Sequence, residues 1–298
     1  MRNNEDAFST LHPTVVFGHF VTVVGVSVVF LHPLILAVSF VGALAYVCYL
    51  KGWSGIRKMF PGVLAMMVFA ALFNPIFNHR GMTILCYWYD NPITLESILY
   101  GLAASLMIGA VLLWFVSYNQ VMTSDKFLCV FGRMIPALSL TFSMVLRFLP
   151  RYFVQAKHIA AAQRGIGRDV FSGSWYARAR HGSAVFSIML TWALENAVDT
   201  SDSMLARGYG LPGRTAYTDF RFRQRDLAAG VTLGGGLLVV IVAIVAGVLR
   251  ANYFPIFDLN AASYLSWLVI AVWGLICATP LIMGLREEAV WRSLRLNL

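Results

Sequence analysis

Long stretches without a single charged residue dominate this sequence and restrict the folds available to it. Residues 7–50 contain no Asp, Glu, Lys or Arg, and this stretch is long enough for two membrane-spanning helices of about 20 residues each. Further charge-free stretches of spanning length cover 59–78, 97–124, 227–249 and 259–285. The sequence therefore predicts an all-α membrane protein with about six transmembrane helices.

Local signals place some of the helix ends. His32-Pro33 divides the first stretch into spans at about 15–31 and 34–50, because proline disfavours helical geometry in the residue before it. Pro75 is expected to kink or end the third span. The aromatic patch Tyr87-Trp88-Tyr89 then predicts an interfacial belt or a short re-entrant piece.

The placement of positive charge orients the spans. Charged residues make up only 12% of the chain, well below the roughly 25% of soluble proteins. If both termini are cytoplasmic, every lysine and arginine except Arg80 and Arg250 falls on the cytoplasmic side. The positive-inside rule favours this arrangement. We therefore expect a multi-pass protein of the cell membrane with both termini in the cytoplasm.

The character of the chain changes between residues 119 and 227, where no charge-free run reaches spanning length. The two longest apolar runs there, 134–146 and 182–194, have the length of buried or interfacial helices. They predict two long cytoplasmic helices, at 133–165 and 182–208, partly under the membrane and joined by a loop at 166–181.

Three parts of the chain follow from this pattern. Residues 1–118 are expected to form about four transmembrane helices, and residues 228–298 about two. Residues 119–227 between them are expected to form a cytoplasmic domain built on the two long helices.

Two similar short sequences close the long helices. They are Ala161-Ala162-Gln163-Arg164-Gly165 and Leu205-Ala206-Arg207-Gly208-Tyr209-Gly210. An arginine at the end of a rigid helix is a forked donor that suits an acidic or carbonyl-lined groove on another protein. The glycine after it can adopt the left-handed conformation that ends the helix. The alternative is that each arginine only complements the helix dipole.

Charged faces on the two long helices suggest how they are held together. Glu195, Asp199 and Asp202 fall within about 60° on one face, and Arg147 and Arg151 share a face of the other helix. One interpretation is two solvated faces. The other is inter-helix ion pairing that fixes the helices as a rigid cross and leaves Arg164 and Arg207 free for a partner.

Small residues mark two predicted packing faces in the spans. Gly101, Ser105 and Gly109 recur at four-residue spacing in the fourth span, and Gly230 and Gly234 do so in the fifth. Small side chains at this spacing let helices approach closely in a membrane. We expect both faces to contact other helices.

Several kinds of chemistry have no support in the sequence. No lysine follows a glycine as Gly-Lys-Ser/Thr, so the chain has no P-loop and is not expected to hydrolyse ATP. The predicted spans contain no charged residue, whereas ion-coupled carriers place ionisable groups inside the bundle. The isolated histidines His19 and His32 favour packing roles. The four scattered cysteines predict neither a disulfide framework nor a metal site, and we predict no enzyme and no cofactor.

The arginine sequences carry a resemblance to a known family. Together with Leu140-Thr141-Phe142-Ser143-Met144-Val145-Leu146-Arg147-Phe148-Leu149-Pro150 and Ser203-Met204, they resemble the transmembrane T component of energy-coupling factor (ECF) transporters. That family carries two Ala-Arg-Gly-like motifs at the ends of long coupling helices. The resemblance is specific over about 133–217, including Gly213-Arg214-Thr215. Gln163 departs from the pattern, which usually has alanine there.

The resemblance implies a function. A T component joins a membrane S component, which binds the substrate, to two cytoplasmic ABC-type ATPases. ATP-driven movement of the coupling helices would reorient the S component, so that a vitamin or a transition-metal ion enters the cell. By this resemblance the ATPase contacts are Gln163, Arg164, Gly165, Ala206, Arg207 and Gly208. The alternatives are a secondary carrier or channel with its own substrate path, and a membrane enzyme or scaffold.

Overall fold

The computed structural model describes residues 7–88, 91–132, 136–209, 211, 220–259 and 263–296. The chain divides into two compact units. Unit 1 comprises Met1–Val130 and Phe220–Leu298, and unit 2 comprises Phe131–Asp219. The central third of the chain is therefore a unit of its own, inserted between two parts that fold together.

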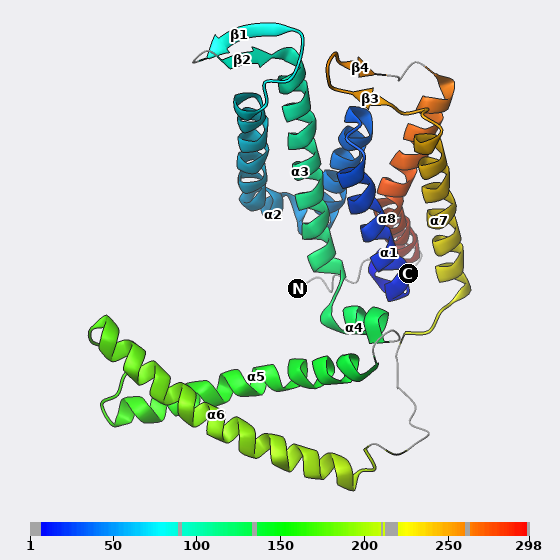
Figure 1. Cartoon of the computed structure of the whole chain (residues 1–298). Coiled ribbons are helices and arrows are strands. Elements are labelled where there is room, and N and C mark those ends of the chain that lie inside the picture. The colour runs from blue at the N-terminus through cyan, green and yellow to red at the C-terminus, as the bar shows by residue number, and fades with distance from the viewer. Residues whose placement is uncertain are drawn as a thin grey trace. The chain divides into compact units, whose positions relative to one another are not determined.

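Unit 1 is a bundle of apolar helices with two short hairpins at one end (Figure 1). Its elements are η1 (Ala7–Thr10), α1 (Pro13–Val29), α2 (Pro33–Phe77), β1 (Ile84–Trp88), β2 (Asn91–Thr94), α3 (Leu95–Val121), α4 (Ser124–Gly132, which runs on into unit 2), α7 (Gln224–Val245), β3 (Ala251–Asn252), β4 (Asp258–Leu259) and α8 (Tyr264–Leu296). Four helices, α2, α3, α7 and α8, are long and apolar enough to cross a membrane, and α1 is a shorter apolar helix. The predicted all-α membrane fold class is confirmed.

Proline and glycine set the boundaries of the first helices. Pro13 and Pro33 each stand at the first position of a helix, where the missing N–H costs nothing. The side chain of His12 accepts a hydrogen bond from the Thr14 N–H and caps α1. Helix α2 has 45 residues, but Gly52 adopts a non-helical conformation with φ of 66°. This break supplies the division between the predicted second and third spans.

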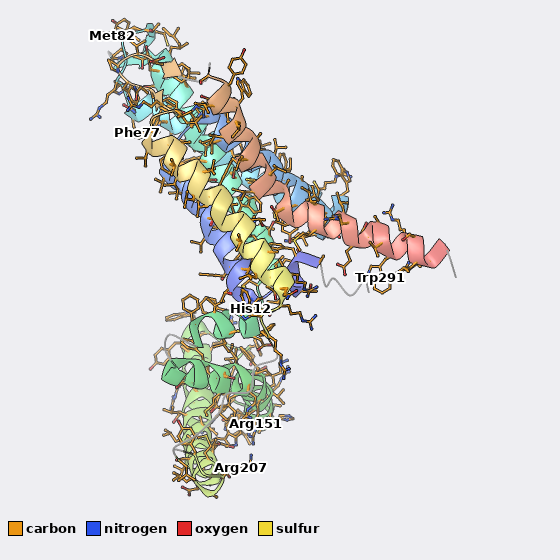
Figure 2. All side chains as sticks on the ribbon, turned by 90° about the vertical axis from the view of Figure 1, so that its right-hand side faces the viewer. His12, Phe77, Met82, Arg151, Arg207 and Trp291 are labelled. Carbon is orange, nitrogen blue, oxygen red and sulfur yellow. The ribbon has the colours of Figure 1, made fainter. Side chains whose placement is uncertain are left out.

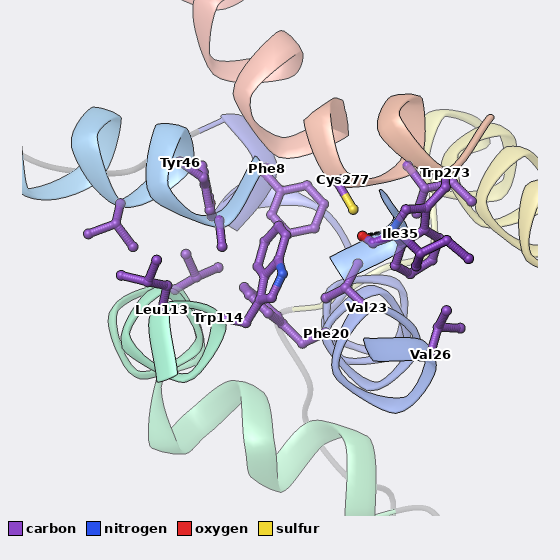
Figure 3. Close-up of a cluster of buried hydrophobic side chains, with 14 of the residues drawn as sticks. Phe8, Phe20, Val23, Val26, Ile35, Tyr46, Leu113, Trp114, Trp273 and Cys277 are labelled. Carbon is purple, nitrogen blue, oxygen red and sulfur yellow. Dashed lines mark hydrogen bonds between the residues drawn. The ribbon is translucent and has the colours of Figure 1, made fainter. Parts of the chain in front are cut away.

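The core of unit 1 combines apolar packing with buried hydrogen bonds (Figure 3). The Trp114 indole on α3 donates to the hydroxyl of Ser39 on α2, and the Trp273 indole on α8 donates to the carbonyl of Ile35. Both tryptophan side chains are fully buried. Hydrogen bonds between membrane helices stabilise by about 0.6 kcal/mol on average, so these contacts fix helix register as well as adding stability.

One end of the bundle is joined by polar contacts between segments far apart in the sequence. The buried Asp226 at the start of α7 accepts hydrogen bonds from the backbone N–H groups of His12 and Arg223. The Lys126 ammonium on α4 donates to the carbonyls of Ser9 and Val121. Figure 2 shows His12 near this end, and Phe77 and Met82 near the other.

Tyr87 and Trp88 of the aromatic patch belong to a β-hairpin, which the sequence did not predict, and Tyr89 lies outside the described residues. Strands β1 and β2 pair antiparallel, with Cys86 opposite Ile93 and Tyr87 opposite Pro92. Short runs of aromatic and branched residues fit a strand as well as an interfacial belt, and the period of the pattern alone does not separate them. A backbone hydrogen bond from Met82 to the carbonyl of Pro255 links this hairpin to the β3–β4 hairpin.

Unit 2 consists of α5 (Pro136–Gly165) and α6 (Trp175–Ala206), which cross each other (Figure 1). Ile159 is the one buried hydrophobic side chain among the described residues of this unit. The Tyr152 and Trp192 rings meet edge to face at 5.5 Å near the crossing. Most other apolar side chains on the two helices are exposed, so the hairpin by itself has almost no core.

The second long helix starts earlier than the sequence predicted. The sequence predicts a loop from 166 to 181, but α6 begins at Trp175. The Ser174 hydroxyl accepts a hydrogen bond from the Ala177 N–H and caps the helix. The expected start at 182 was wrong because it followed the first long apolar run and ignored this cap.

Candidate functional site

The end of α5 presents Arg164, although the helix does not stop at the predicted glycine. The backbone N–H of Gly167 bonds to the carbonyl of Arg164, and that of Arg168 bonds to the carbonyl of Gln163. Gly167 has φ of 79°. These contacts form a Schellman cap with Gly167 in the left-handed position. Gly165 is the last residue of α5 itself, so the expectation that Gly165 ends the helix in this conformation was wrong.

The end of α6 follows the prediction. The N–H of Gly208 bonds to the carbonyl of Leu205, and that of Tyr209 bonds to the carbonyl of Met204. Gly208 has φ of 81°, and Arg207 is the C-cap residue. This is again a Schellman cap, here with the left-handed glycine directly after the arginine. Gly210 and the sequence Gly213-Arg214-Thr215 lie outside the described residues.

The two arginines therefore hold different positions in similar caps. Arg207 comes directly before the left-handed glycine, whereas Arg164 comes three residues before its own. Two residues correspond to about 200° around a helix axis. The similar sequences thus present their guanidinium groups in different directions, and two partner grooves would be approached at different angles.

Arg164 already has an acidic partner within the chain. Its Nε lies 3.3 Å from an Asp169 carboxylate oxygen, while its side chain remains 70% exposed. The other Asp169 oxygen accepts a hydrogen bond from the Phe171 N–H, which fixes the carboxylate. The expectation that Arg164 is free was wrong, because the cap turns the chain back past the helix end. An exposed ion pair contributes only about 0–1 kcal/mol, so a partner can displace it.

The other residues of the two motifs differ in accessibility. Arg207 and Ala206 are exposed, and Arg207 has no ion pair within the part of the chain that the structure describes. Gln163 is half-buried, and its side-chain oxygen is buried without a hydrogen-bond partner. Its amide is therefore directed inward, and it does not extend the exposed surface around Arg164.

The predicted ion pairing between α5 and α6 is not what joins them. Across residues 136–209, no ion pair connects Arg147 or Arg151 with the acidic residues Glu195, Asp199 and Asp202, which are all exposed. The Arg151 guanidinium instead lies over the Trp192 ring, 5.6 Å from its centroid. Crossing helices diverge on both sides of the crossing, so only the residues nearest to it meet. A cation–π contact of this kind contributes about 0.5–1 kcal/mol at an exposed site.

The predicted small-residue face on α3 packs against α2. A Cβ added at Gly101 would lie 3.0 Å from the carbonyl oxygen of Ala71, and one at Gly109 would lie 2.6 Å from the Met67 sulfur. Ser105 between them is buried. This face therefore holds α3 and α2 at a distance that larger side chains would not allow.

The face on α7 differs from the prediction. A Cβ added at Gly230 would make ordinary contact with Val15 at 3.7 Å, but one at Gly234 would meet nothing within 4 Å. The close contact is at Gly236, where an added Cβ would lie 2.9 Å from Ile276 on α8. The four-residue spacing predicts a contact at Gly234, but in the structure it is Gly236 that faces α8.

The cap of α5 gives a testable contrast between two glycines. Gly167→Ala is expected to loosen the helix end by about 1–2 kcal/mol, because its φ of 79° strains any residue with a Cβ. Gly165→Ala is expected to stabilise it by about 0.5–1 kcal/mol, because Gly165 is helical and a Cβ there meets nothing within 4 Å. Amide hydrogen exchange of the whole protein, read from the proteolytic fragment that covers residues 160–168, measures both effects. Faster exchange in the Gly165→Ala variant would contradict this account of the cap.

Comparison with known proteins gives the following similarities. No protein-family model matches the chain. It is 26% identical over 205 residues to the "Energy-coupling factor transporter transmembrane protein EcfT" of Lactobacillus helveticus, covering 63% of this chain and 71% of that protein. It is also 26% identical over 185 residues to the protein of the same name from Staphylococcus aureus, covering 58% of this chain and 68% of that one. A shorter match to the "Uncharacterized protein MG181 homolog" of Mycoplasma pneumoniae is 28% identical over 110 residues and covers 37% of this chain and 25% of that protein.

Proposed function

We propose, from its similarity to energy-coupling factor transporter transmembrane proteins, that this chain belongs to their family and is the coupling (T) subunit of an ECF-type importer. In this role it links two cytoplasmic ABC-type ATPases to a membrane S component that binds the substrate. The transported substrate is a vitamin or a transition-metal ion. The chain itself performs no catalysis, and ATP is hydrolysed by its partners.

One observation carries the proposal: two arginines stand at the capped ends of two long crossing helices, and both are exposed. Each end is rigid because a Schellman cap closes it. A guanidinium held in this way can form forked hydrogen bonds with carboxylates or with the carbonyls at a helix end. We assign Arg164 to one ATPase subunit and Arg207 to the other.

The ion pair of Arg164 and the contacts at the helix crossing suggest a sequence of events. Asp169 holds the Arg164 guanidinium until an ATPase groove replaces it as the acidic or carbonyl partner. The contacts of Trp192 with Tyr152 and Arg151 keep the crossing together, so that a push on one helix end reaches the other helix. Movement of the hairpin then reorients the S component. In this scheme residues 119–227 transmit force, and the flanking parts, 1–118 and 228–298, supply the membrane scaffold.

The orientation of the subunit is part of the proposal. Both termini and residues 119–227 face the cytoplasm, because this places nearly all lysines and arginines on that side. The end of unit 1 that contains His12 and the α7 start is then cytoplasmic, and the end with the two hairpins faces outward.

Reconstitution with ATPase subunits and an S component tests both function and orientation. Uptake of substrate is expected to require ATP hydrolysis, and ATPases added from outside are expected to bind only to inside-out vesicles. Substrate transport by the chain alone, without ATP, would support the alternative of a secondary carrier or channel. ATPase binding to right-side-out vesicles would contradict the orientation.

A further inference from the structure

The tip of the α5–α6 hairpin, residues 166–180, exposes three large aromatic side chains close together in sequence. Phe171 is 78% exposed, Trp175 is 84% exposed and Tyr176 is 76% exposed. Ile166 in the same tip is also exposed. Scattered apolar residues are ordinary on a protein surface, but three neighbouring aromatic rings that all face solvent indicate a contact surface.

The loop does not fold these rings inward, because other groups of the tip fix its path. The Arg178 Nε donates to the carbonyl of Val170, and the Ser174 hydroxyl caps α6. A Cβ added at Gly173 would lie 3.5 Å from that of Ala177, so the loop already packs on the first turn of the helix through its small residues. These contacts fix the path of the tip, and its three aromatic rings face outward.

Positive charge accompanies the rings. Arg168, Arg178 and Arg180 lie in the tip, and its single acidic residue, Asp169, is engaged by Arg164. Tyr176 and Arg180 are four residues apart and so share one face of α6, one turn from each other. The tip thus combines exposed Trp and Tyr side chains with exposed arginines.

We propose that the hairpin tip binds anionic phospholipid headgroups at the surface of the bilayer. Trp and Tyr prefer the membrane–water interface, where the ring is in an apolar layer and its polar atom stays hydrated. Each arginine beside an anionic leaflet strengthens binding to the membrane by about fivefold. Unit 1 has four helices long and apolar enough to cross a membrane, and the chain joins unit 2 to it at both ends, so the tip is tethered to the bilayer that unit 1 would span. The tip lies next to Arg164, so the lipid contact would adjoin the proposed ATPase contact but would use different side chains.

Spin-label accessibility in the full-length chain tests the proposal. The label is attached at Ser172→Cys, an exposed position in the tip, after Cys48, Cys86 and Cys129 are replaced by alanine and the buried Cys277 is kept. The chain is placed in nanodiscs of phosphatidylcholine alone or mixed with phosphatidylglycerol. We expect the label to become accessible to oxygen and shielded from a water-soluble nickel chelate only in the anionic nanodiscs. A label at Ser201→Cys, exposed at the far end of α6, is expected to stay aqueous.

Charge variants separate lipid binding from other contacts. The double variant Arg168→Gln, Arg180→Gln is expected to lower the ratio of lipid-bound to free tip by about twenty-fivefold. The shielding of the label at 172 in anionic nanodiscs reports this ratio. Lys157→Gln, which removes an exposed charge of α5 outside the tip, is expected to leave the ratio unchanged. A label at 172 that remains in water in both kinds of nanodisc would overturn the proposal. So would shielding that appears only when ATPase subunits are added, because the surface would then bind protein.

Discussion

The double variant Arg164→Ala, Arg207→Ala is expected to abolish ATP-dependent uptake while its insertion into the membrane stays normal. Both side chains are exposed at helix ends and neither contributes to a core, so the fold does not depend on them. Loss of a charge-assisted contact from a desolvated interface costs about 2–5 kcal/mol. Two such losses weaken association by several powers of ten, because each 1.4 kcal/mol corresponds to about tenfold.

Single and conservative variants refine this prediction. Each alanine change alone is expected to reduce uptake without abolishing it. Arg→Lys at either position is expected to impair coupling as well, since lysine keeps the charge but not the fork. Arg292→Ala is a matched control, because Arg292 is also exposed and also forms an exposed ion pair, with Glu288 at 3.3 Å. Uptake in vesicles measures all of these variants, and equal loss in the Arg292→Ala variant would show that the effect is not specific.

Gly101→Leu is expected to disrupt the membrane bundle. A Cβ at this position already meets the Ala71 carbonyl oxygen at 3.0 Å, the Asn74 Cβ at 3.1 Å and the Pro75 Cδ at 3.3 Å. Backbone and ring atoms cannot move aside as a flexible side chain does, so α2 and α3 must separate. Overpacking of this kind costs about 1–3 kcal/mol, or more, and we expect a melting temperature several degrees lower and a reduced yield of monodisperse protein.

Gly234→Leu provides the matched control for Gly101→Leu. Both residues are helical glycines in membrane segments, but a Cβ at Gly234 meets nothing within 4 Å in this chain. Its melting temperature in detergent is therefore expected to stay near that of the unchanged protein. Similar destabilisation by the two variants would contradict the observed packing. A loss that appears with Gly234→Leu only in the assembled transporter would place that residue at a contact with the S component.

Much of the fold was predictable because membrane helices are selected by length and hydropathy. The charge-free stretches correspond to α1, α2, α3, α7 and α8, and the division of α2 falls at a glycine that the sequence places after Lys51. The β1–β2 hairpin was not predictable in this way. A short aromatic run carries no period that separates a strand from an interfacial segment.

The candidate site was predictable in its arginines but not in its geometry. Pattern alone identified Arg164 and Arg207, whereas the conformation of Gly167 depends on where the α5 hydrogen bonds end. The pairing of Arg164 with Asp169 could not be predicted, because an acidic residue five positions after an arginine is close to it only if the chain turns back. Likewise, the contact of Arg151 with Trp192 depends on where the helices cross, which no spacing within one helix reveals.

Direct binding of ATPase subunits to the purified chain in nanodiscs tests the coupling role most directly. The Kd for the unchanged chain is compared with that for the Arg164→Ala, Arg207→Ala variant, and Arg292→Ala serves as the control. For the two ATPase subunits binding together as a pair, the account predicts a Kd at least about a thousandfold higher for the double variant, from two losses of about 2 kcal/mol or more. A double variant that binds the ATPases with the same Kd as the unchanged chain would contradict it.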